Sequence, residues 1–165
     1  MSTFTSILLV SPLADGNTWV VMREFDFVLG DSGDAPIAVP MGFETDFASR
    51  PRPFWAILPK WGKYGNAAVV HDWLYWSQSE GSTRAQADSA LRDGMITLHV
   101  SPLQREPIYW AVRLFGWLAW YRNRADKAAG YQRVLAQLPT DAGARTQRRG
   151  QYSRIMRHLF GNRTL

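Results

Sequence analysis

The chain of 165 residues contains no cysteine, which excludes both a disulfide framework and a thiolate zinc site. Any metal ion would be held by oxygen and imidazole ligands. Because the chain has only three histidines, a multi-histidine zinc site is disfavoured. A site for Ca²⁺ or Mg²⁺ built from oxygen ligands, or no metal at all, fits this composition better.

Long hydrophobic runs are missing as well. The first ten residues have neither the positive leader nor the small-residue cleavage site of a signal peptide. The longest apolar segment, residues 107–121, is interrupted by Arg113 and is shorter than the roughly 20 residues that span a bilayer. We therefore expect no signal peptide and no transmembrane helix.

The remaining composition predicts one folded domain. Apolar residues make up 46% of the chain and aromatic residues 13%, which suffices for one core in a chain of this length. We expect a single α+β domain over residues 1–138 and a basic tail, partly helical or disordered, over residues 139–165.

The predicted tail is basic because residues 143–165 hold six arginines and no acidic residue, within a net charge of +5 for the chain. Two interpretations stay open: a solvated chain end, or a segment that binds nucleic-acid phosphates, anionic lipid or an acidic protein. Nothing in the sequence favours nucleic acid among these partners. Four apolar residues of the tail fit one face of a short helix: Ile155, Met156, Leu159 and Phe160.

Alternating apolar residues over 19–29 predict a strand between two turn-forming segments. With residues 6–10 and 36–39, this strand suggests a small antiparallel sheet, because connections this short favour hairpins. The loop that follows, residues 39–55, combines aromatic side chains with three prolines. Its Asp46 and Ser49 either brace the loop through backbone hydrogen bonds or belong to a site.

Helical periodicity dominates after residue 65. We predict helices over residues 66–78 with Asn66 as N-cap, from 82 or 83 to 98, over 103–123, and over 124–138. The expected fold is thus a small N-terminal antiparallel sheet followed by a bundle of three to four helices. The tryptophans at 110, 117 and 120 have two interpretations, core or interface packing and insertion into a lipid headgroup region.

The most informative segment is residues 67–76, where adjacent His71 and Asp72 lie in an apolar stretch with Tyr75 one turn later. Burying an imidazole or a carboxylate is costly unless each is hydrogen-bonded or binds a metal. In a helix, His71 and Tyr75 share a face, whereas Asp72 points about 100° away. The pair therefore cannot form a hydrogen-bonded dyad, and each residue needs its own partner.

For His71, Asp88 or Asp46 can accept one ring proton, which leaves the other nitrogen as a general base or a metal ligand. The partner of Asp72 can be a metal ion, Arg84 or an amide at a helix end. The alternative is that His71 is a satisfied core histidine and Asp72 anchors a structural salt bridge. The catalytic candidates of the predicted site are His71, Asp88 and Tyr75, and its candidate metal ligand is Asp72. The supporting residues are Asp46, Ser49 and Arg84.

Several separated motifs resemble a family found in phages and prophages, domain of unknown function 1353. They are Val39-Pro-x-Gly-Phe-x-Thr-Asp46-Phe-Ala-Ser49-x-Pro-Arg52, Ala-Ala-Val-Val-His71-Asp-Trp-Leu-Tyr75, Thr-Arg84-x-x-Ala-Asp88 and Tyr109-x-Ala-Val-Arg113-x-Phe-Gly116. The resemblance covers about residues 36–120. It implies a tailed-phage or prophage product, in the host cytoplasm while it is made and then in the virion, with other phage structural proteins as partners.

The segment His71-Asp72-x-x-Tyr75 is also similar to the active-site helix of phospholipase A2 enzymes. That similarity implies His71 as the base that activates water, Asp72 as a calcium ligand and Asp88 as the carboxylate that orients His71. It further implies calcium-loop carbonyls from Gly62 and Gly65. The flanking cysteines and the glycine-rich calcium loop of those enzymes are absent from this sequence.

Together these patterns lead to two functional hypotheses. The first is a phage hydrolase, metal-assisted or not, that cleaves an ester or amide bond in the lipid or cell wall of the host envelope. The second is a structural component of a phage tail or baseplate whose His/Asp cluster only holds the fold together.

Overall fold

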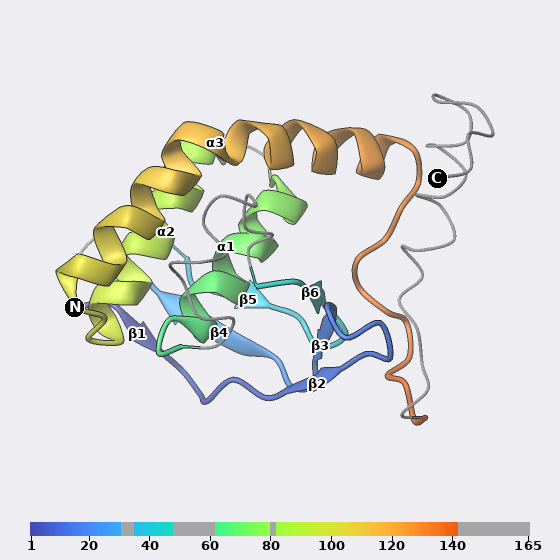
Figure 1. Cartoon of the computed structure of the whole chain (residues 1–165). Helices are drawn as coiled ribbons and strands as arrows, with labels where there is room; N and C mark the ends of the chain where they lie inside the picture. The colour runs from blue at the N-terminus through green and yellow to red at the C-terminus, as the bar shows by residue number, and fades with distance from the viewer. Residues whose placement is uncertain (31–34, 48–61, 80–81, 142–165) are drawn as a thin grey trace.

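The computed structural model describes residues 1–30, 35–47, 62–79 and 82–141. Within these residues the protein is α+β, with two small antiparallel sheets in the N-terminal part followed by three helices. Figure 1 shows the helices gathered on one side of the strands, with α1 closest to them. The predicted fold class and the N-terminal position of the strands are confirmed.

Each sheet has three short strands. The first has the order β1 (Thr3–Phe4), β4 (Phe25–Val28) and β5 (Ile37–Val39). The second has the order β2 (Val10–Pro12), β3 (Trp19–Val21) and β6 (Glu44–Thr45). Only the expected strand at 36–39 corresponds closely to one of these, β5.

The single strand predicted over residues 19–29 is wrong, because the structure divides it between the two sheets as β3 and β4. Arg23, which breaks the alternation of apolar residues, lies in the gap between them. Just before it, the Met22 amide donates to the Leu9 carbonyl, which extends the pairing of β3 with β2 by one residue. The strand predicted over residues 6–10 is also misplaced, since residues 6–9 connect β1 to β2.

Helix α1 (Gly65–Ser77) begins one residue after Tyr64, so the prediction of Asn66 as its N-cap is wrong. It ends at Gln78, whose left-handed backbone stops the helix near the predicted position. Helix α2 (Arg84–Thr97) starts at a capping box, because the Thr83 side chain accepts from the Gln86 amide and the Gln86 side chain accepts from the Thr83 amide.

Helix α3 (Pro102–Ala128) is longer than predicted and is bent (Figure 1). Its first half lies beside α2, and its second half crosses over the end of α1. A separate helix over residues 124–138 is not formed, so this predicted helix is wrong. Gly130, with φ +86°, follows the end of α3 and turns the chain out of the helical path.

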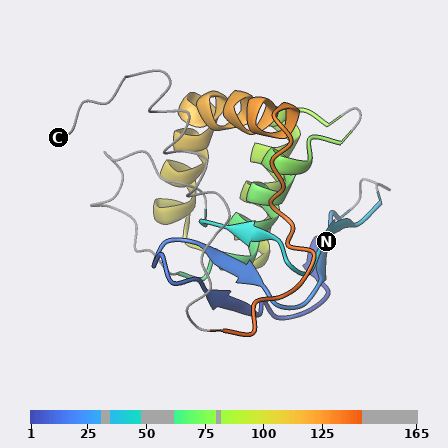
Figure 2. The same ribbon diagram turned by 90° about the vertical axis from the view of Figure 1, so that its right-hand side faces the viewer.

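After α3, residues 129–141 run beside the second sheet (Figure 2). We call this segment the 129–141 strap. Its backbone pairs with the start of β6 and the residues before it: the Glu44 amide donates to the Arg133 carbonyl, and the Leu135 amide donates to the Gly42 carbonyl. This non-local pairing satisfies backbone groups that a fourth helix would have satisfied internally.

The main core lies between α1 and the sheets. It combines Phe25, Phe27 and Phe43 from the strand region with Val69 and Val70 of α1, all at most 2% exposed. In the described part of the chain, no helix is both long and apolar enough to cross a membrane. The predicted tail from residue 142 onward, as well as Ser49, lies outside the described residues.

Candidate functional site

Helices α1 and α2 bring His71, Tyr75 and Asp88 together. His71 Nε2 lies 3.1 Å from Asp88 Oδ1, and the Tyr75 hydroxyl donates to the same oxygen at 2.6 Å. The His71 and Tyr75 rings lie against each other with centroids 4.0 Å apart. The helical spacing of four residues in α1 thus directs both side chains at one buried carboxylate.

Two arginines bind the other oxygen of that carboxylate. Arg84, one turn before Asp88 on α2, donates to Asp88 Oδ2 at 3.1 Å, and Arg113 of α3 donates to it at 2.8 Å. The same Arg84 nitrogen lies 3.2 Å and 3.0 Å from the carbonyl oxygens of Val112 and Arg113. Because these carbonyls belong to the interior of α3, Arg84 enters its hydrogen-bond ladder, which is a known cause of helix bending.

Helix α3 approaches Tyr75 closely at Gly116. A Cβ atom added at Gly116 would clash with the Tyr75 hydroxyl oxygen. The absence of a side chain at this position therefore lets α3 pack against the phenol that donates to Asp88.

The charge state of Asp88 follows from its partners. Burial raises the pKa of this carboxyl group, but hydrogen bonds from His71, Tyr75 and Arg113 lower it by more, so its pKa lies below the ordinary value. Burial raises the pKa of Tyr75, and the neighbouring Asp88 raises it further. Asp88 is thus an ionised acceptor, and Tyr75 is a protonated donor.

An ionised Asp88 fixes the tautomer of His71. Because the carboxylate carries no proton, the proton between it and His71 must reside on Nε2, an assignment made from the hydrogen-bond partner. In the neutral imidazole, the lone pair is then on Nδ1. That atom is buried and has no hydrogen-bond partner in the described part of the chain. The nearest carboxylate oxygen of Asp72 is 4.0 Å away, which is too far for a hydrogen bond.

Asp72 points to the sheet rather than to Asp88. Its Oδ2 accepts from the Thr45 hydroxyl of β6 at 2.6 Å, and Asp72 is 6% exposed. The Thr45 oxygen in turn accepts from the Phe47 amide at 3.1 Å. Among the described residues, His71 is thus bonded to Asp88 and Asp72 to Thr45, and 4.0 Å separates Nδ1 of His71 from Oδ1 of Asp72.

The described residues do not gather around Asp72 as a metal site. No group of three or more His, Asp or Glu side chains within them is arranged to hold a metal ion. The phospholipase A2 similarity implied that Gly65 supplies a calcium-loop carbonyl near Asp72. Gly65 begins α1 seven residues before Asp72, which separates the two residues by about 10 Å along the helix axis. Of the two carboxylates considered for His71, Asp88 is the partner; Asp46 lies half-buried just after β6.

Three site residues were missed from the sequence: Arg113, Thr45 and Gly116. The signal for Arg113 was present, since an arginine within an apolar helical run needs a carboxylate partner. Thr45 and Gly116 stand in the family motifs quoted above, but no physical pattern predicts their roles, which depend on how the sheet and α3 pack against α1.

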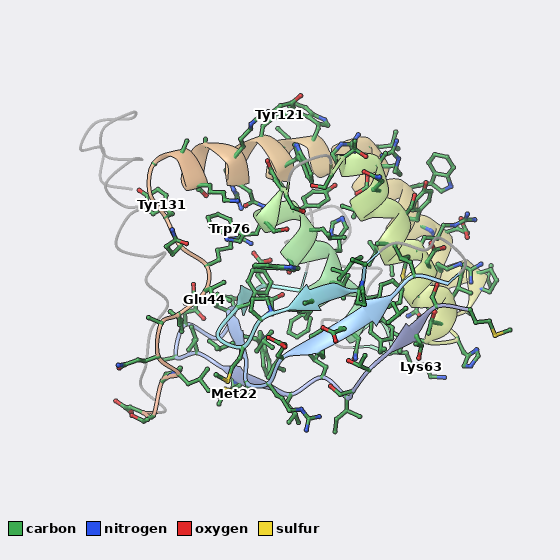
Figure 3. All side chains as sticks on the ribbon, turned by 180° about the vertical axis from the view of Figure 1, so that it is seen from behind. Met22, Glu44, Lys63, Trp76, Tyr121 and Tyr131 are labelled. Atoms are coloured by element: carbon green, nitrogen blue, oxygen red, sulfur yellow. The ribbon has the colours of Figure 1, made fainter. Side chains whose placement is uncertain are left out.

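A second polar cluster lies at the end of α1. The Asn123 side chain of α3 donates to the Tyr75 carbonyl at 3.1 Å and accepts from Arg133 at 2.9 Å. Arg133 is 4% exposed, and its guanidinium lies 5.2 Å from the centroid of the Trp76 ring. Figure 3 labels Trp76 on α1 and Tyr131 on the 129–141 strap. The cluster joins α1, α3 and the strap.

Comparison with known proteins assigns a family. The model of a family described as "Protein of unknown function (DUF1353)" matches residues 19–112, more than half of the chain. The chain belongs to this family. The matched region contains His71, Asp72, Tyr75, Arg84 and Asp88 and ends just before Arg113.

One curated relative is a protein described as "Uncharacterized protein y4jT" from Sinorhizobium fredii (strain NBRC 101917 / NGR234). It is 32% identical over 93 residues, which is 55% of this chain but 27% of the relative. The chain therefore spans little more than a quarter of that protein. No solved structure matches the chain. These comparisons give no support to the phage link or to the phospholipase A2 similarity.

Proposed function

We propose that this DUF1353 protein is a hydrolase in which His71 is the general base. The observation that carries the proposal is the bond between His71 Nε2 and the ionised Asp88, which leaves Nδ1 as the basic atom. Tyr75, Arg84 and Arg113 hold Asp88 in place from three helices. A base whose partner is fixed in this way needs little rearrangement when it takes up a proton.

The reaction we propose is attack of water on an ester or amide carbonyl. Nδ1 takes a proton from the water as the oxygen bonds to the carbonyl carbon, and the imidazolium later gives that proton to the leaving alkoxide or amine. The negative Asp88 stabilises the imidazolium throughout. The proposed step uses the water, His71 and Asp88 alone.

The proposed substrate class is a lipid or peptidoglycan of a bacterial envelope, and the proposed setting is a phage or prophage. Support for this setting is limited to the resemblance between the motifs of this chain and a family found in phages. In that setting the protein would assist entry or lysis, either within the virion or from the host cytoplasm.

A structural role in a phage tail or baseplate is the second candidate. It is favoured by burial: His71 is 3% exposed and Asp88 is fully buried. The hydrogen bonds of Asp88 connect all three helices, which is what a purely structural cluster would do.

A His71→Gln variant separates the two candidates. The glutamine amide can still donate to Asp88 but has no basic nitrogen. Wild type and variant would be assayed for fatty-acid release from phosphatidylglycerol vesicles and for soluble fragments from labelled peptidoglycan. His99→Asn is the matched control, because His99 is exposed and its φ of +53° suits asparagine.

The hydrolase proposal predicts that wild type and His99→Asn turn over one of these substrates. It predicts that His71→Gln loses about 100-fold or more in rate while it keeps a similar melting temperature. If wild type cleaves neither substrate, or His71→Gln is as active as wild type, the hydrolase proposal is wrong and the structural role stands.

A further inference from the structure

Helix α3 carries an apolar stripe on the side that faces away from the protein. Its members recur at helical spacing, and each is about half exposed or more: Trp110 56%, Leu114 61%, Trp117 48%, Leu118 57% and Tyr121 61%. We call these five residues the α3 outer stripe. The buried residues of the same helix, Ile108, Ala111 and Asn123, lie on its inner side. Figure 3 shows Tyr121 projecting outward from α3.

Between Glu106 and Asp126, the charged residues of α3 have one sign. Residues 107–125 contain no aspartate or glutamate and three arginines. Arg113 is bound to Asp88, and Arg122 and Arg124, which follow Tyr121 in the sequence, are exposed. At 100° per residue, these two arginines lie on opposite flanks of the stripe. The stripe is therefore an apolar surface with exposed positive charges on both flanks of its Tyr121 end.

We propose that the α3 outer stripe docks on an anionic phospholipid surface. Tryptophan and tyrosine favour the headgroup region, where an apolar ring and a polar edge are both accommodated. Leucines reach the acyl boundary, and arginines bind the phosphates of anionic lipids. The proposal goes beyond the hydrolase and does not depend on it, because lipid binding is measurable with the inactive His71→Gln variant.

The shape of α3 favours a lipid surface over a second copy of the chain. The stripe follows the outer side of a bent helix (Figure 1), so it is convex along its length. Two identical convex faces meet over a small area, whereas a stable dimer needs an extended complementary interface. Lipid headgroups deform around a convex apolar ridge and so contact more of it.

Vesicle flotation tests this proposal. Vesicles of phosphatidylglycerol mixed with phosphatidylethanolamine are compared with vesicles of phosphatidylcholine alone. We expect wild type to bind the anionic vesicles, with weaker binding at high salt. Trp117→Ser/Tyr121→Ser and Arg122→Gln/Arg124→Gln should each lower the partition coefficient by roughly tenfold or more.

Matched controls change the same residue types elsewhere. Ile7→Ser and Met41→Ser remove exposed apolar side chains from the strand region, and Arg23→Gln removes an exposed arginine; all three should bind like wild type. Every variant keeps the basic residues 142–165. Unchanged flotation of both double variants would overturn the proposal and assign binding to that segment. A wild-type dimer that the stripe variants convert to monomer, without vesicle binding, would overturn it in favour of a second copy.

Discussion

Asp88 accepts hydrogen bonds on both carboxylate oxygens, from His71 and Tyr75 on one and from Arg84 and Arg113 on the other. Its burial is costly for a charge, and these donors offset the cost. At the scale of single residues, the site is therefore organised by the carboxylate rather than by the His71–Asp72 pair that is conspicuous in the sequence.

Replacing this carboxylate should be among the most damaging single changes at the site. We expect Asp88→Asn to lower the free energy of unfolding by roughly 3 kcal/mol, since two arginines lose a charged partner. Urea denaturation at neutral pH measures this. Asp93→Asn, also on α2, should stay within about 0.5 kcal/mol of wild type. Equal effects of the two substitutions would show that Asp88 is not the stabilising centre.

The lowered pKa of Asp88 also predicts how stability depends on pH. Its folded pKa lies below the unfolded value of about 4. The stabilisation is therefore complete above that unfolded value and is lost as pH falls through the folded pKa. We expect the difference in free energy of unfolding between wild type and Asp88→Asn to decrease steadily as the pH falls below about 4. A gap that is constant in this range would contradict an ionised Asp88.

At the scale of elements, the sequence predicted the helices better than the strands. Periodic apolar residues and the capping box at Thr83 locate α1 and α2, because these signals are local. The strands have two to four residues each, and their partners are distant in the chain, so periodicity misassigned Trp19–Leu29. The end of α3 was misjudged because the 129–141 strap gains backbone pairs with the sheet that no local pattern encodes.

Contact between α1 and α3 depends on the missing side chain at Gly116. Gly116→Ala should destabilise the protein by about 1–3 kcal/mol, because the new methyl group meets the Tyr75 hydroxyl. Combining it with Tyr75→Phe removes that oxygen. A double-mutant cycle in urea should then show the pair to be less destabilised than the sum of the single changes. Strict additivity would show that the clash is relieved elsewhere.

At the scale of the whole molecule, the strap holds the helices to the second sheet. Arg133 links it to Asn123 and Trp76, and its backbone pairs with Glu44. The family match ends at residue 112, before most of α3 and all of the strap. The matched region thus contains most of the candidate site, while Arg113, Gly116 and the strap complete its surroundings.

Removing the buried charge of the strap should therefore loosen the whole fold. We expect Arg133→Met to lower the free energy of unfolding by roughly 2 kcal/mol, because Asn123 loses a buried donor. The matched control is Arg124→Met, at an exposed arginine, which should change the free energy of unfolding by less than about 0.5 kcal/mol. Thermal unfolding compares the two, and a stable Arg133→Met protein would show that the strap is dispensable.

The central claim is that Asp88 fixes His71 with its proton on Nε2 and its lone pair on Nδ1. Nitrogen-15 NMR of the imidazole ring at neutral pH tests it most directly, since protonated and unprotonated ring nitrogens differ strongly in chemical shift. We expect a protonated Nε2 and an unprotonated Nδ1 in wild type, and loss of this fixed tautomer in Asp88→Asn. A proton on Nδ1 with Nε2 bare, or a tautomer unaffected by Asp88→Asn, would contradict it.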